Sequence, residues 1–222
     1  MSETTRPLDP QEQLRLIDEQ RVRARRATEP SAAGILAVWG VAWFVGYLTI
    51  HLTGTLFGGP GWAWIVFGVV MMLALLYTVV VYARSQSGMR GPTRTVGTLY
   101  SVAWVIAFTS IFLFAGRIAE LIEAAGVPAA QLQEIHSVLM NLLVCLVIGV
   151  IYMVGNALWR SPVEWALGAW IIAVAVAATL APFEWLFLIM AVAGGGGFLL
   201  GAAVLHFRGN RRHRPVEEGS RR

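Results

Sequence analysis

One apolar segment carries a row of small and polar residues that could line a site. The row consists of Ser137, Asn141, Cys145, Gly149, Tyr152 and Asn156. The first four recur every fourth residue and the last two follow with helical drift, so the row occupies one face of an α-helix. In a membrane this face must turn away from lipid. Such groups can line a pathway or bind a small neutral ligand, and they can equally join packed helices by hydrogen bonds. We expect packing to be the main role, with ligand lining as the alternative.

A second apolar segment contains "AGGGGFLLGAA", with four consecutive glycines followed by a fifth. These are Gly194, Gly195, Gly196, Gly197 and Gly201, the last two in a G-x-x-x-G pattern. Small residues let neighbouring helices approach closely, which is the expected role. Each glycine also costs about 1 kcal/mol relative to alanine in a helix, so a hinge that frees backbone carbonyls for a substrate is the alternative.

Two histidines, His51 and His136, lie near the predicted outer border of different apolar segments. A pair at one depth could ligate haem, or could help bind a divalent metal near Glu134 and Glu184. Both histidines stand at segment ends, where a histidine is readily hydrated and does not by itself indicate a ligand site. We therefore expect no cofactor and keep haem or a divalent metal as a weak alternative.

The usual signatures of catalysis and ion coupling are absent from the sequence. None of the apolar segments carries Asp, Glu, Lys or Arg away from its ends, although proton relays and voltage sensors depend on such residues. Walker-type, H-E-x-x-H, G-x-S-x-G and dinucleotide-binding motifs are missing as well. The sequence thus disfavours a proton-coupled pump and predicts that the protein is not an enzyme.

The elements that position these residues follow from composition. Of the 222 residues, 57% are hydrophobic and 14% are charged, against about 25% charged in soluble domains. Uncharged runs of about 20 residues span a hydrocarbon core as helices. The sequence therefore predicts an all-α, polytopic transmembrane bundle. Six spans are expected at about residues 33–52, 62–82, 96–116, 135–158, 165–181 and 183–207, within a membrane domain of residues 31–207.

The arginines predict the orientation of this bundle. Six lie in the N-terminal tail, three between the second and third spans, one at Arg160 and six towards the C-terminus. A six-span topology places all of these on one side and only Arg117 on the other. By the positive-inside rule both termini are cytoplasmic. We call the opposite side the outer side. The arginines stand at membrane borders, so the net charge of +4 indicates contact with lipid and no nucleic-acid partner.

The two tails are basic, and the first is expected to be partly helical. In residues 1–30, Asp9 caps a helix that begins at Pro10 and runs to about Ala27. Four arginines at its membrane-proximal end are expected to contact lipid headgroups. These are Arg21, Arg23, Arg25 and Arg26. The alternative is a docking helix for a protein partner or for a second copy of the chain. Residues 208–222 form the C-terminal cytoplasmic tail.

Partial similarity between three spans suggests an internal repeat. "VAWFVGYLTIHLTG" from Val41 and "VAWVIAFTSIFLFAG" from Val102 share several positions, and "GAWIIAVAVAA" from Gly168 is similar to both. These segments lie in the first, third and fifth spans. Three tandem helical hairpins would explain the pattern, as would chance similarity between apolar spans.

The tail "LRLIDEQRVRARR" followed by the span "WGVAWFVGY" resembles small multi-pass membrane proteins of actinobacteria, often labelled putative transporters or uncharacterised. This resemblance implies a bacterial plasma membrane and lends no functional residues. Arginine in place of lysine throughout also suggests a GC-rich genome. We expect a small transporter or a membrane component of a transport complex. The alternatives are a scaffold or regulatory protein that binds a partner through its N-terminal helix and, less favoured, a haem-binding redox protein.

Overall fold

The computed structural model describes residues 9–16, 20, 32–57, 61–86, 92–159 and 162–211. Within these ranges the chain is helical and contains no strand. The elements are α2 (Ala32–Phe57), α3 (Trp62–Gln86), α4 (Pro92–Ala124), α5 (Ala129–Trp159), α6 (Pro162–Leu180), α7 (Phe183–Ile189), the π-helix η1 (Met190–Gly195) and α8 (Gly196–Arg211). The last three join into one continuous rod, which we call the last span. Six segments are long and apolar enough to cross a membrane, which confirms the predicted all-α bundle of six spans.

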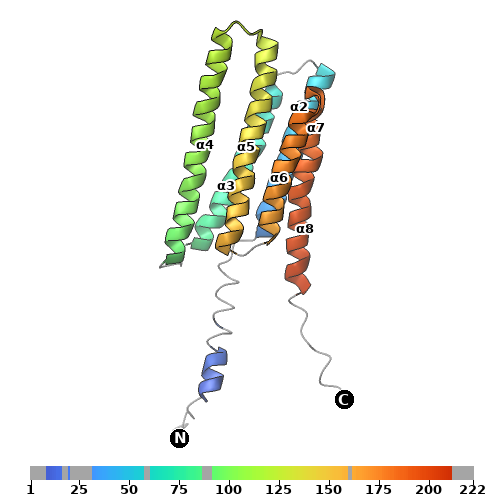
Figure 1. The fold of residues 1–222 in the computed structure, drawn as a ribbon. Coiled ribbons are helices and arrows are strands. Elements are labelled where there is room, and N and C mark those ends of the chain that lie inside the picture. Colours follow the sequence, from blue (N-terminus) through green and yellow to red (C-terminus); the bar gives the residue numbers. More distant parts are fainter. Residues whose placement is uncertain are drawn as a thin grey trace.

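The six spans stand side by side (Figure 1). Helix α2 begins and α8 ends at the same end of the bundle, as an even number of crossings requires. Helix α2 is central, since it packs against α3 and against all three parts of the last span. The contact between α2 and the last span is the most extensive, followed by that between α5 and α6, whereas α4 packs mainly on α5 and α3 mainly on α2. The first and last spans therefore pair at least as closely as spans that are neighbours in the sequence, and the predicted sequence repeat is not tested by this arrangement.

The outer connection between α4 and α5 is a helical hairpin. Helix α4 has 33 residues and α5 has 31, so each is about 45–50 Å long and exceeds a hydrocarbon core of about 30 Å. Gly126 in the turn has φ of +79°, a left-handed conformation that suits glycine at a helix end. The exposed ion pair between Arg117 and Glu120, with 2.9 Å between Nη1 and Oε2, lies on the outer part of α4.

The centre of the bundle is filled by aromatic rings. Trp43 and Tyr47 of α2 contact each other edge to face, with their centroids 5.6 Å apart. Phe198 of α8 meets Trp43 at 5.0 Å and Tyr152 of α5 at 6.2 Å. Apolar lipid provides little hydrophobic drive between helices, so this close packing is what holds the spans together. Four spans thus meet around one core, because Met190 of the last span and Ile171 of α6 are also fully buried there.

Glycines mark the points where backbones touch. A Cβ atom on Gly149 of α5 would lie 2.7 Å from the carbonyl oxygen of Gly168 on α6. A Cβ atom on Gly195 of the last span would lie 2.9 Å from the backbone nitrogen of Phe44 on α2. No larger residue fits at either position without a shift of the backbone, so these glycines set the interhelical distances.

The last span changes its winding at mid-membrane. Six residues from Met190 to Gly195 form a π-helix between two α-helical stretches, and the backbone dihedrals at both junctions remain right-handed helical. The indole Nε1 of Trp170 on α6 donates a hydrogen bond to the carbonyl oxygen of Ala193 within this π-helix, at 2.9 Å. A π-helix alters the regular hydrogen-bond ladder, and here a neighbouring helix supplies a donor.

The N-terminal tail is described only in part. Residues 10–16 are helical, and the backbone nitrogen of Gln13 donates to the carbonyl oxygen of Asp9 at 2.9 Å, as expected for a helix that begins at Pro10. Leu14 of this helix is 64% exposed. The lipid-contacting arginines predicted at positions 21–26 lie outside the described residues, so that prediction is untested.

Candidate functional site

The small and polar row of α5 faces the interior. Ser137, Asn141, Cys145 and Gly149 are all buried, and Tyr152 is half-buried. Asn156 belongs to α5, but its side chain lies outside the described part of the structure. The periodicity of polar residues within an apolar segment was therefore sufficient to identify the inward face.

At the outer half of the row, Asn141 bonds to a residue of another span. The hydroxyl of Tyr47 donates to Asn141 Oδ1 at 3.0 Å, and the Cys145 thiol approaches the same oxygen at 3.9 Å. The other amide atom, Asn141 Nδ2, is buried without a hydrogen-bond partner. A buried donor without a partner costs about 1–3 kcal/mol. Asn141 is thus the point of the described core where a further polar group is missing.

The inner half of the row is closed by packing. Cys145 is fully buried, and Gly149 rests on the backbone of Gly168. Farther inward, Tyr152 lies between Trp104 and Phe198, with centroid distances of 6.1 Å and 6.2 Å. In this conformation the row joins helices, as expected for packing, and the inner half leaves no room for a solute beside these residues.

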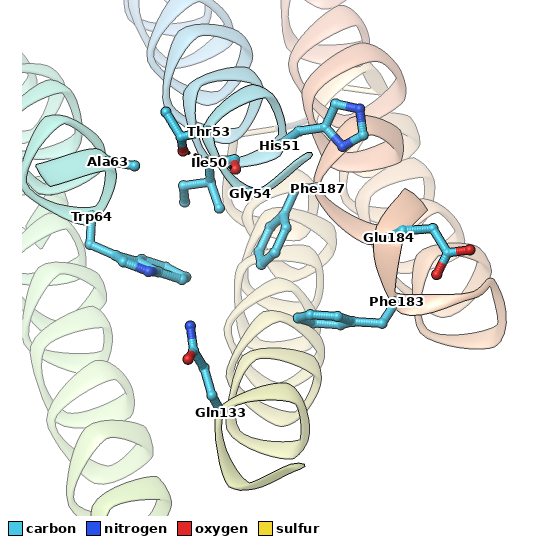
Figure 2. A pocket seen from close by; sticks show the side chains of 10 residues that line it. All are labelled: Ile50, His51, Thr53, Gly54, Ala63, Trp64, Gln133, Phe183, Glu184 and Phe187. Carbon is cyan, nitrogen blue, oxygen red and sulfur yellow. Dashed lines mark hydrogen bonds between the residues drawn. The ribbon is translucent and has the colours of Figure 1, made fainter. Parts of the chain in front are cut away.

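A cavity of about 360 Å³ opens at the outer end of the bundle, between α2, α3, α5 and α7. Ten residues line it: Ile50, His51, Thr53, Gly54, Ala63, Trp64, Gln133, Phe183, Glu184 and Phe187. Figure 2 shows the rings of Trp64, Phe183 and Phe187 around a common space that the Gln133 amide approaches. The volume is at the low end of the range of small-molecule pockets, about 300–1,000 Å³.

The lining of this outer cavity is mainly apolar by exposed surface and contains no lysine or arginine. Glu184 is its only carboxylate, and this group points away from the three rings (Figure 2). The hydroxyl of Thr53 already donates within α2, to the carbonyl oxygen of Thr49 at 2.7 Å. The cavity therefore suits a small, largely apolar molecule, and His51 is its only basic lining residue.

The outer cavity lies directly above the Tyr47–Asn141 pair. Phe187, which lines the cavity, stacks on Tyr47 with the ring centroids 6.4 Å apart. Ile50 stands one turn outward of Tyr47 on α2, about 4.5 Å along the helix. On α5, the lining residue Gln133 stands two turns outward of Asn141, on the same face. Phe187 and, on α5, the buried Ser137 lie between the cavity and this amide.

Only one of the two histidines lines the outer cavity. His51 and Glu184 both line the outer cavity, whereas His136 does not line it and is partly exposed. Among the described residues, no group of three or more His, Cys, Asp or Glu side chains is placed to hold a metal ion. The weak alternative of a metal site near His51 and His136 thus gains no support from the geometry.

The glycine run serves close packing at most of its positions. Gly194 lies against the Trp43 ring, Gly197 against the indole of Trp170, and Gly201 within van der Waals distance of Leu36. Gly195 meets the backbone of α2, whereas a Cβ atom on Gly196 would meet nothing within 4 Å. The helix continues through all of these glycines, and its irregular winding begins before them, at Met190.

The sequence alone did not reveal Tyr47 or the outer cavity. Tyr47 stands in an apolar run, and His51 is the one polar residue three or four positions away from it, so periodicity gives little signal there. Hydrogen-bonding needs could have pointed to Tyr47, because a buried Asn141 needs a partner and Tyr47 carries a hydroxyl at a matching depth of another span. The cavity lining comes from four helices, and no local pattern unites them.

Comparison with known proteins gives no relative from which a role can be taken. No protein-family model, curated protein or solved structure matches this chain. The functional assignment must therefore come from the site itself.

Proposed function

We propose that this integral membrane protein is a small transporter that receives a small, largely apolar solute in its outer cavity. The observation that carries the proposal is the aromatic-lined cavity at the outer end of the bundle. The absence of charged residues at the centre of the spans favours a carrier without a proton relay. The arginine-only basic composition supports the plasma membrane of a bacterium as its location.

The arrangement corresponds to one end state of such a carrier, with the solute site open outward and the path inward closed. Tyr47, Asn141 and Cys145 close the path beneath the outer cavity, and the contact between Gly149 and Gly168 closes it further in. Transport then requires movement of the elements that border Cys145. The π-helix at Met190–Gly195 is suited to this movement, since such segments interrupt the regular ladder and often mark functional sites.

The test uses Cys145, the only cysteine in the chain. We expect a membrane-impermeant thiol reagent, trimethylammonium-ethyl methanethiosulfonate, to modify Cys145 slowly in membranes as the path opens. Ala63→Phe fills the outer cavity and should reduce the modification rate at least tenfold. The matched control is Ile65→Phe on the same helix, because Ile65 is 68% exposed on the lipid-facing side.

Gln133→Cys, at the cavity wall, provides a positive control for the reagent, and mass spectrometry of the purified protein gives the extent of modification. Failure to modify Cys145 in any condition, while Gln133→Cys reacts, would rule out an aqueous path past the row. Equal rates of Cys145 modification in Ala63→Phe and Ile65→Phe would show that the path to Cys145 does not pass through the outer cavity.

A scaffold or regulatory role is the second candidate, and the exposed N-terminal helix favours it. Leu14 is 64% exposed, an apolar side chain that a protein partner or a second copy of the chain would cover. Deletion of residues 1–26 should abolish co-purification of a partner if this is the main role, and should leave Cys145 modification unchanged in a self-contained carrier.

A further inference from the structure

The buried amide of Asn141 has half of its hydrogen-bonding capacity unused. Its side chain is 94% buried, since only 6% of the residue is exposed, and Nδ2 has no partner. Rotating the amide would not remove the deficit, because the Tyr47 hydroxyl would then face Nδ2 and leave Oδ1 without a donor. In either orientation, one of the two polar atoms of the Asn141 amide lacks a hydrogen-bond partner.

This unused donor lies one aromatic layer inward of the outer cavity. Phe187 contributes to the cavity wall and stacks on Tyr47, whose hydroxyl fixes the Asn141 amide. A solute that moves inward from the cavity along the α5 row passes the buried Ser137 and then reaches this amide, one turn farther in. The amide then offers it an N–H donor.

We propose that Asn141, held by Tyr47, is the polar recognition point of the transport path, and that the solute carries a hydrogen-bond acceptor such as a carbonyl oxygen. This inference rests on the proposed function and names its substrate class. We assign a neutral solute, because the cavity wall contains no lysine or arginine, His51 is its only basic side chain, and its carboxylate points away from the rings. Its body is a small ring system that fits between Trp64, Phe183 and Phe187.

A matched pair of probes separates the acceptor from the ring. Indanone is a bicyclic aromatic ketone, and indane has the same rings without the carbonyl. We expect indanone to bind the full-length protein in nanodiscs about tenfold more tightly than indane, by saturation-transfer NMR titration. Infrared spectra should show the carbonyl stretch of bound indanone at a lower wavenumber than in hydrocarbon solvent, since it accepts a hydrogen bond.

The variant for this test replaces both members of the pair. Tyr47→Phe with Asn141→Leu removes the donor and leaves only the weak thiol donor of Cys145 without its acceptor, so the fold is expected to persist. In this double variant the two probes should bind equally, and the carbonyl stretch should return to its value in hydrocarbon. Thr78→Val is the control, because it removes a different interhelical hydrogen bond, from Trp39, at 2.9 Å and away from the cavity.

The possible results separate the two proposals. Equal binding of the probes to the unmodified protein, or an indanone preference that survives in the double variant, overturns the role of Asn141 and leaves the cavity as a binding site. If neither probe binds the unmodified protein, the inference and the cavity-based function both fail.

Discussion

Gly149 and Gly168 bring the backbones of α5 and α6 into direct contact, so that a Cβ atom on Gly149 would lie 2.7 Å from the carbonyl oxygen of Gly168. A methyl group there must push the helices apart, which costs about 1–3 kcal/mol. We expect Gly149→Ala to lower the free energy of unfolding by about 2 kcal/mol, measured by denaturant titration in micelles.

Gly68→Ala on α3 is the matched control for this substitution. A Cβ atom at Gly68 would meet nothing within 4 Å, and alanine has the better helix propensity, so the variant should be neutral or slightly more stable. Similar losses for the two variants would contradict a close contact between α5 and α6.

The hydrogen bond from Trp170 to the Ala193 carbonyl should contribute measurably to stability. Trp170→Phe keeps a ring beside Gly197 but removes the donor, and interhelical hydrogen bonds in membranes contribute about 1 kcal/mol. We expect a loss of about that size in the same titration. Trp165→Phe, at an exposed position on the same helix, should change stability by less than half as much. If Trp170→Phe is as stable as the unmodified protein, this bond does not support the π-helix.

Tyr47 and Asn141 should be coupled energetically. Tyr47→Phe removes the donor to Oδ1, and Asn141→Leu removes the acceptor of the tyrosine hydroxyl, so each is expected to cost about 1–2 kcal/mol. The double variant should cost less than the sum, because neither the tyrosine hydroxyl nor the asparagine amide is then left without its partner. Strict additivity in this cycle would show that the two side chains do not interact.

The orientation inferred from the arginines can be tested with reporter fusions. Green fluorescent protein fused after Arg222 should fluoresce, and alkaline phosphatase inserted at the turn around Gly126 should be active, since that enzyme matures only outside the cytoplasm. Sixteen of the 17 arginines lie on the side assigned to the cytoplasm. The reverse pattern of activities would invert the topology and place the cavity on the cytoplasmic side.

The six spans and the inward face of α5 were predictable because both follow from local properties. Length and apolarity decide whether a segment can cross a membrane, and residues such as Ser137 and Asn141 cannot face lipid without cost. Helices α3 and α4 were equally predictable as spans, but not as the peripheral helices they prove to be. Only 6% and 11% of their apolar windows are buried in the bundle, which depends on where the neighbouring helices lie.

The partner of Asn141 and the winding of the last span required the structure. Which span approaches which is decided by contacts such as Gly149 with Gly168, and a single sequence does not pair such positions. The glycine run drew attention to residues 194–197, yet the π-helix begins at Met190. It packs against α2 and accepts the Trp170 hydrogen bond at the carbonyl oxygen of Ala193.

The π-helix has a consequence for the register of the last span. A π-helical turn holds more residues than an α-helical turn, so this span contains an additional residue within Met190–Gly195 compared with a regular α-helix. Moving the π-helix along the span by one residue would reorient the residue that it passes by about 100°, the angle per residue of an α-helix, while the two flanking helical parts keep their orientation. Phe187 and Phe198 each lie three residues outside the π-helix, so their contacts with α2 would persist while residues between them turn to a new face.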